Sequence, residues 1–229
     1  QRREHWDQVY REKSPTRTSW FQPEPSLSLA LIQGAGIGLN AAIIDVGGGE
    51  SVLVDCLLDR GFNQLTVLDI SAVALDRVRQ RLPADSPVQW IVADITDFEP
   101  STRFSLWHDR AVFHFLTDSE DRAAYKAALE QGLAPGAQLV IGTFALDGPE
   151  RCSGLEVVRY DADSLGRELG PGFELLDQED EVHTTPWGTQ QKFCFFRYRD
   201  DKFIRVFLLK IYLPSSTYFK SSLQKFLSG

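Results

Sequence analysis

An acid, a glycine turn and a second acid are the residues of this chain best suited to binding a cofactor. Asp45 lies near the end of a short apolar run, the turn Gly47-Gly48-Gly49 follows it, and Asp69 ends the next predicted strand. A glycine turn that leads into a helix presents backbone N–H groups to a ligand, and an acid that ends the neighbouring strand accepts hydrogen bonds from ribose hydroxyls. The pattern therefore predicts a nucleotide-cofactor site.

The kind of cofactor depends on what surrounds the glycines. The dinucleotide fingerprint needs a third glycine where this chain has Val52, and the carboxylate of Asp45 would repel a pyrophosphate but attract an ammonium group. S-adenosylmethionine (SAM) carries an ammonium and a sulfonium and no phosphate, so we predict SAM as cofactor and S-adenosylhomocysteine (SAH) as product. An NAD-dependent oxidoreductase, a non-catalytic SAM-binding scaffold and a plain strand-to-helix turn are the alternatives.

The elements that must position these residues alternate between strands and helices. The hydrophobic pattern predicts parallel strands at 41–46, 65–69, 88–93, 104–109 and 137–144, and helices at 51–60, 72–81 and 118–131. A helix at 161–169 and two antiparallel strands at 173–183 and 189–199 follow. Before this region we expect a helical cap followed by a loop, and we expect Thr117 and Glu120 to form a capping box.

In this order of elements and in its motifs, the chain over about residues 5–199 resembles class I SAM-dependent methyltransferases. The resemblance implies an α/β, Rossmann-like, doubly wound and mostly parallel seven-stranded sheet with a C-terminal antiparallel β-hairpin. It also implies that the glycine turn holds the methionine part of SAM, that Asp69 binds the ribose, and that Ile70, Asp94 and Ile95 bracket the adenine. Glu50 departs mildly from the motif.

The segment that ends the fourth strand holds the candidate catalytic residues, His108, Asp109 and His114. It is similar to the D-K-G-x-x-D stretch of lysine methyltransferases related to those that act on citrate synthase and elongation factor 1A, with His114 in place of the second acid. Methyl transfer is an in-line displacement, so a base matters only for an acceptor that must lose a proton. Asp109 is also a candidate cofactor contact.

Other residues are expected to border the reactants. Trp20 is assigned to the cofactor, and together with Tyr10 and Phe21 it would form a lid, because a sulfonium is attracted to aromatic faces. The candidate substrate-binding residues are Tyr10, Phe21, Arg110, Arg151 and Trp187. We expect a small-molecule acceptor, with protein-lysine N-methylation as the alternative.

Composition sets the remaining expectations. The net charge of −8 disfavours a nucleic-acid partner, the three scattered cysteines predict a reducing compartment and no metal site, and no apolar stretch is long enough to span a membrane. We expect three regions: a cap at 1–40, the methyltransferase domain at 41–199 and a basic, apolar extension at 200–229. A cytoplasmic location is expected, with an organellar one left open because the chain contains no methionine. The oligomeric state is left open.

Overall fold

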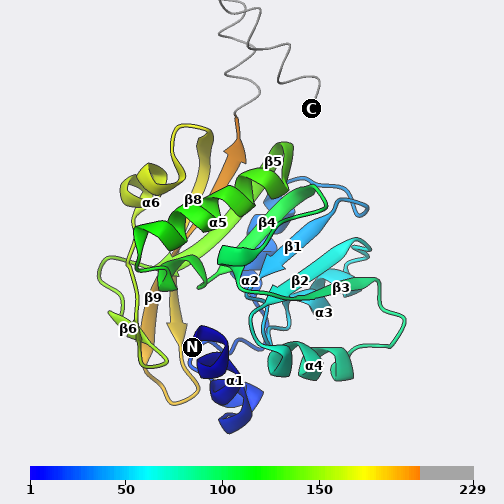
Figure 1. Cartoon of the computed structure of the whole chain (residues 1–229), viewed down its shortest axis with the longest axis vertical. Helices are drawn as coiled ribbons and strands as arrows, with labels where there is room; N and C mark the ends of the chain where they lie inside the picture. Colours follow the sequence, from blue (N-terminus) through cyan, green and yellow to red (C-terminus); the bar gives the residue numbers. More distant parts are fainter. Residues whose placement is uncertain (202–229) are drawn as a thin grey trace, which may run out of the picture.

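A computed structural model describes residues 1–201 and shows a single seven-stranded sheet with helices on both faces (Figure 1). The strand order is β3-β2-β1-β4-β5-β9-β8. The parallel strands are β1 (Ile43–Val46), β2 (Leu65–Asp69), β3 (Val88–Val92), β4 (Phe104–Arg110) and β5 (Leu133–Phe144). β8 (Phe173–Thr184) and β9 (Gln190–Asp200) form the antiparallel hairpin, which confirms the predicted fold class.

The register of β1 with its two neighbours brings the candidate acids to one edge of the sheet. Asp45 pairs with Val67 of β2 on one side and with His108 of β4 on the other. Because the strands are parallel, their carboxyl ends lie together, and the glycine turn after β1 lies between the ends of β2 and β4. This arrangement is where open α/β sheets bind ligands.

Two hydrophobic layers hold the helices to the sheet. On one face α2 (Ser26–Gly34), α3 (Leu53–Asp59) and α4 (Ala72–Arg81) bury residues such as Ile32, Leu57 and Leu75. On the other face α5 (Ser119–Gly132) and α6 (Ala162–Leu169) bury Leu129 and Leu165. All five helices therefore turn an apolar face to the strands, as a doubly wound sheet requires.

The N-terminal region differs in part from the prediction. The expected cap is present as α1 (Arg2–Glu12), followed by a short 3₁₀ turn, η1 (Pro15–Arg17). The expected loop after it is wrong, because residues 26–34 form α2. This helix begins directly after Pro25 without a side-chain cap, so no start signal marked it, and the burial of its apolar residues against the core stabilises it.

Smaller differences lie around the cavity described below. A two-stranded hairpin of β6 (Arg151–Cys152) and β7 (Leu155–Glu156) replaces part of the expected loop. Two 3₁₀ turns, η2 (Ile95–Asp97) and η3 (Phe113–Phe115), follow β3 and β4. The predicted capping box at α5 is wrong, since its N-cap residue is Asp118 and no side-chain capping bond forms. Nearly all of the predicted extension, residues 202–229, lies outside the described residues.

Candidate functional site

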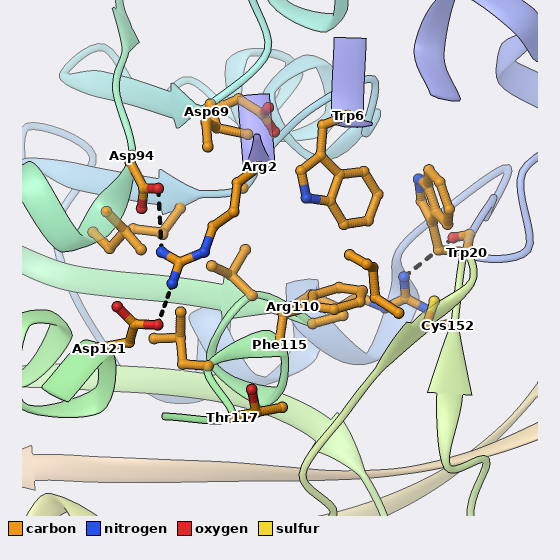
Figure 2. A pocket seen from close by; sticks show the side chains of 18 of the residues that line it. Arg2, Trp6, Trp20, Asp69, Asp94, Arg110, Phe115, Thr117, Asp121 and Cys152 are labelled. Atoms are coloured by element: carbon orange, nitrogen blue, oxygen red, sulfur yellow. Dashed lines mark hydrogen bonds and ion pairs between the residues drawn. The ribbon is translucent and has the colours of Figure 1, made fainter. Parts of the chain in front are cut away.

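A cavity of about 470 Å³ opens at the carboxyl ends of the parallel strands (Figure 2). Its walls come from the ends of β1, β2, β3 and β4, from α1, from the β6–β7 hairpin and from the start of β9. A second cavity of about 50 Å³ adjoins it and shares the lining residues Tyr10, Trp20, Gly47 and Arg110. The larger volume is within the range of small-molecule sites.

The glycine turn closes tightly against its neighbours. Gly47 has a φ of 68° and donates its N–H to the carbonyl of Leu68 at 2.7 Å, and a Cβ at this position would collide with Val112. Gly49, with a φ of 46°, lies beside the hydroxyl of Tyr10. A side chain at Gly47 or Gly49 would therefore be strained in the backbone and would strike a neighbour. Gly48 lines only the smaller cavity.

Asp69 lies on the wall of the larger cavity beside Ile70. Its side chain is almost fully buried, and its Oδ1 accepts a hydrogen bond from the backbone N–H of Ser71 at 2.8 Å. Burial raises the pKa of Asp69 to about 7, against the lowering effect of the backbone N–H groups of Ser71 and Gly49. With this pKa the carboxyl group changes between its protonated and ionised forms near neutral pH.

Asp94 and Ile95, which follow β3, also line the larger cavity. Arg2 of α1 donates from Nη1 to Oδ2 of Asp94 at 3.3 Å and from Nη2 to Asp121 of α5, so its guanidinium bridges two carboxylates (Figure 2). Neither Arg2 nor Asp121 was predicted from the sequence. Their pairing depends on a contact between residues far apart in the chain.

Asp45 and His108 form a buried pair next to the smaller cavity. Nδ1 of His108 lies 2.7 Å from Oδ1 of Asp45, and Nε2 lies 2.9 Å from the hydroxyl of Ser28. Since a carboxylate only accepts, the ring donates from Nδ1 and accepts from Ser28 when it is neutral. His108 thus orients Asp45 and ties α2 to the sheet, and it does not line the larger cavity.

Asp109 is fully buried beneath the turn that follows β4. Its carboxylate accepts from the backbone N–H of Val112 at 2.8 Å, from that of Phe113 at 3.1 Å and from the hydroxyl of Tyr125 at 2.7 Å. Burial raises the pKa of Asp109 to about 6, and these three donors oppose the shift. The turn contains Ala111 at a φ of 71°, so the three bonds hold a strained backbone.

His114 is also fully buried, between Phe115 and Phe144. Nδ1 accepts the N–H of Phe144 at 3.4 Å, and burial together with the charge of Arg110 lowers the pKa of His114 to about 3. The imidazole is therefore neutral near pH 7. None of His108, Asp109 and His114 lines the larger cavity, and each bonds to other residues of the protein, so their catalytic role stays a prediction.

The predicted substrate-side residues are divided between the two cavities and the surface. Arg110, Arg151 and Tyr10 line the larger cavity, Phe21 lines only the smaller one, and Trp187 lines neither, with 58% of its surface exposed at the β8–β9 turn. Figure 2 shows Arg110 beside Trp20 and Cys152, on the side of the cavity opposite Arg2. The larger cavity is also lined by four residues that were not predicted from the sequence: Trp6, Phe115, Cys152 and Gln191.

Residues 1–201 contain no group of three or more His, Cys, Asp or Glu side chains arranged to hold a metal ion. Within the same range no helix is long and apolar enough to cross a membrane.

Comparison with known proteins finds methyltransferases among those similar to this chain. Residues 43–136 match the model of the methyltransferase domain family. The chain is 32% identical over 117 residues to nodulation protein S of Rhizobium tropici, a match that spans 51% of this chain and 47% of that protein. It is 28% identical over 189 residues to EEF1A lysine methyltransferase 2 of Homo sapiens, covering 77% and 75% of the two chains. The first match spans about half the length of its curated relative.

The fold has close counterparts among solved structures. The N-methyltransferase NodS from Bradyrhizobium japonicum WM9, solved in complex with SAH, superposes with a TM-score of 0.62 at 18% identity and covers 85% of this chain and 97% of its own. As the sequence predicts, the chain has the fold of the class I SAM-dependent methyltransferases, and its residues 43–136 match the methyltransferase domain family.

Proposed function

We propose that this protein transfers the methyl group of SAM to a small-molecule acceptor. One observation carries the proposal: a single cavity joins three of the residues predicted for the cofactor, Gly47, Asp69 and Asp94, to the aromatic and polar wall formed by η3, the β6–β7 hairpin and β9. Donor and acceptor can therefore lie end to end, as an in-line displacement requires. The SAH-bound structure of NodS supports the same choice of cofactor.

The residues present fit SAM. Gly47 has no room for a side chain, Asp69 offers a buried carboxyl group, and Ile70 and Ile95 offer apolar surface in the same cavity. When bound, SAM would supply a methyl group that its sulfonium already activates. The task of the chain is then to align the reactants and exclude water, and the aromatic side chains of Trp6, Tyr10 and Trp20, which line the cavity, serve that purpose.

No histidine lines the larger cavity among the described residues, and the carboxyl groups that do so are Asp69, Asp94, Asp118, Asp121 and Glu156. Of these, only Glu156 lies on the hairpin side. Its side chain is 77% exposed and pairs with Arg151 at 3.6 Å. The proposed reaction therefore relies on positioning, with an acceptor atom that is nucleophilic without help from a buried base.

Protein-lysine methylation is the second candidate. The match to human EEF1A lysine methyltransferase 2 favours it, since that match covers about three quarters of both chains. The structure offers less to a lysine acceptor, because the position of the second acid in the lysine methyltransferase pattern is His114, which is buried and does not line the cavity.

The deciding experiment is incubation of the protein with methyl-labelled SAM and a cell extract separated into protein and small-molecule fractions. We expect the label in the small-molecule fraction. Transfer to the protein fraction alone would favour the lysine alternative, and no transfer to either fraction, with SAH binding intact, would favour a non-catalytic SAM-binding scaffold.

A further inference from the structure

The side chain of Arg110 leaves the end of β4 in the direction of the antiparallel hairpin. Its guanidinium carbon lies 4.7 Å from the ring centre of Phe193 on β9, and Nη2 lies 3.7 Å from Oε2 of Glu181 on β8. In the sheet β5 separates β4 from β9, whereas β1 and β2 lie on the other side of β4. The positive charge is therefore carried away from Asp69 and Asp94, into the acceptor half of the cavity.

This guanidinium is only partly paired. Nη1 donates to the carbonyl oxygen of Trp20 at 3.1 Å, but Nε and Nη2 have no hydrogen-bond acceptor among the described residues, although only 12% of the side chain is exposed. Nη2 and Oε2 of Glu181 form an ion pair at 3.7 Å, which is longer than a hydrogen bond, and this Oε2 has no hydrogen-bond donor within residues 1–201. A buried cation with unused donors is costly unless a ligand completes it.

The surroundings of Arg110 define what such a ligand must resemble. Phe115, Phe144 and Phe193 form an aromatic wall. Gln191, 8% exposed, has an Oε1 without a donor among the described residues. Burial lowers the pKa of Arg110, an effect that Glu181 opposes and that a bound anion would also oppose. An apolar body with one negative group matches both the wall and the charge.

We propose that the methyl acceptor is a small molecule with an aromatic or apolar body and a carboxylate, and that Arg110 binds this carboxylate. The inference rests on the proposed function and names its acceptor class. Arginine binds carboxylates through two parallel N–H donors, and Nε and Nη2 are the two donors left unused here. A lysine acceptor would bring an ammonium group against a guanidinium, which the same geometry disfavours.

The carboxylate of SAM itself is the competing source of the negative group, because Arg110 also lines the smaller cavity beside the glycine turn. The two sources are separable by ligand. SAH carries the amino-acid carboxylate and 5′-methylthioadenosine does not, whereas benzoate and benzamide differ in charge and little in shape.

The test measures binding by calorimetry to the full chain. Benzoate, benzamide and benzylamine are titrated into protein saturated with SAH. We expect benzoate to bind at least tenfold more tightly than either of the others. Equal binding of benzoate and benzamide, or stronger binding of benzylamine, would overturn the inference. If SAH itself fails to bind, the proposed function fails first, and the two failures are distinguishable.

Two variants test whether Arg110 is the residue that binds the carboxylate of benzoate. Arg110→Gln should weaken benzoate binding at least tenfold and change the affinities for SAH and methylthioadenosine equally little. The matched control is Arg197→Gln, which removes an arginine that is 15% exposed on β9 and does not line the cavity; it should leave benzoate binding unchanged. A loss of SAH affinity without a loss of methylthioadenosine affinity in Arg110→Gln would assign Arg110 to the donor and refute the proposal.

A second variant keeps the test independent of how well Arg110→Gln folds. Glu181→Gln removes the anion nearest to Arg110 while leaving an amide oxygen that can accept from Gln22, its partner at 2.9 Å. Benzoate affinity should rise several-fold in this variant, because the bound carboxylate no longer competes with Glu181. A fall in benzoate affinity would count against an anionic acceptor.

Discussion

Asp69 and Asp109 lie at the carboxyl ends of the strands on either side of β1, and both side chains are almost fully buried. Asp69 forms part of the cavity wall, whereas the carboxylate oxygens of Asp109 accept hydrogen bonds from two backbone N–H groups and from the hydroxyl of Tyr125. The same residue type therefore has two uses, and the neighbours of each carboxylate decide which one applies.

The raised pKa of Asp69 predicts a pH dependence of cofactor binding. Ribose hydroxyls donate to the ionised carboxylate, so the affinity for SAH should fall as pH is lowered through about 7, by up to about tenfold per pH unit. Calorimetric titration between pH 6 and 8.5 measures this. Asp69→Asn should bind SAH weakly with a flat profile; an unchanged slope in that variant would place the titrating group elsewhere.

The same shift has the opposite sign for the ligand-free fold. Because the folded pKa of Asp69 lies above its unfolded value, this group stabilises the ligand-free protein most below about pH 4, and the contribution is lost as pH rises through about 7. Cofactor binding and the stability of the ligand-free protein thus respond to pH in opposite directions at this residue.

Asp109→Ala tests whether this residue supports the fold. Removing an acceptor that serves three buried donors should lower the free energy of unfolding by about 3 kcal/mol or more, while Tyr125→Phe, which removes one donor, should cost about half of that. Urea titration measures both. Normal stability with lost methyl transfer in Asp109→Ala would support the catalytic role expected from the sequence.

At the scale of elements, side-chain contacts join α1 to the rest of the site. Asp7 accepts from the hydroxyl of Ser71 at 2.5 Å, Arg2 bridges Asp94, which follows β3, and Asp121 of α5, and Trp6 packs edge-on against Phe115 at 5.0 Å between ring centres. The helix forms no part of the sheet, and three of its residues line the cavity. Local opening of α1 is therefore the expected route for ligand exchange.

Trp6→Ala should accelerate the release of SAH. The substitution removes the ring that contacts both Phe115 and Trp20, so the closed position of α1 loses much of its apolar contact, and we expect a dissociation rate about tenfold higher. Stopped-flow displacement measures the rate. Glu4→Ala, on the exposed side of the same helix, is the control; equal rates in all three proteins would show that α1 does not gate the cavity.

At the scale of the whole molecule, the sheet order places the glycine turn of β1 between the strand ends that supply Asp69 and Arg110. The cofactor half of the cavity therefore lies toward β2 and β3, and the acceptor half lies toward β5 and β9. The β6–β7 hairpin and α1 lie beside this edge of the sheet and supply residues that line the cavity (Figure 1).

This arrangement predicts selectivity between cofactors. SAM or SAH should raise the melting temperature, because a ligand at one hundred times its dissociation constant stabilises the fold by about 2.7 kcal/mol. NAD should not, since Asp45 adjoins the turn and Val52 stands where a third glycine would admit a pyrophosphate. Thermal denaturation with each ligand measures the shift. Stabilisation by NAD and not by SAH would contradict the assignment.

Much of the fold and half of the site follow from local sequence. The strand at 65–69 and the helix at 72–81 have the predicted bounds, and Asp69, Ile70, Asp94 and Ile95 do line one half of the cavity. These features depend on periodicity and on the ends of parallel strands, which are properties of short segments.

The sequence by itself determined the doubly wound sheet and the cofactor motif, because each depends on residues that are close in the chain. Only the tertiary structure decided how His108, Asp109 and His114 are used, since Ser28, Tyr125 and Phe144, which bond them, come from other elements. It also decided that Arg110 faces Phe193 with donors unused. The burial of a side chain and the identity of its hydrogen-bond partners depend on residues far apart in the chain, so no local sequence pattern predicts them.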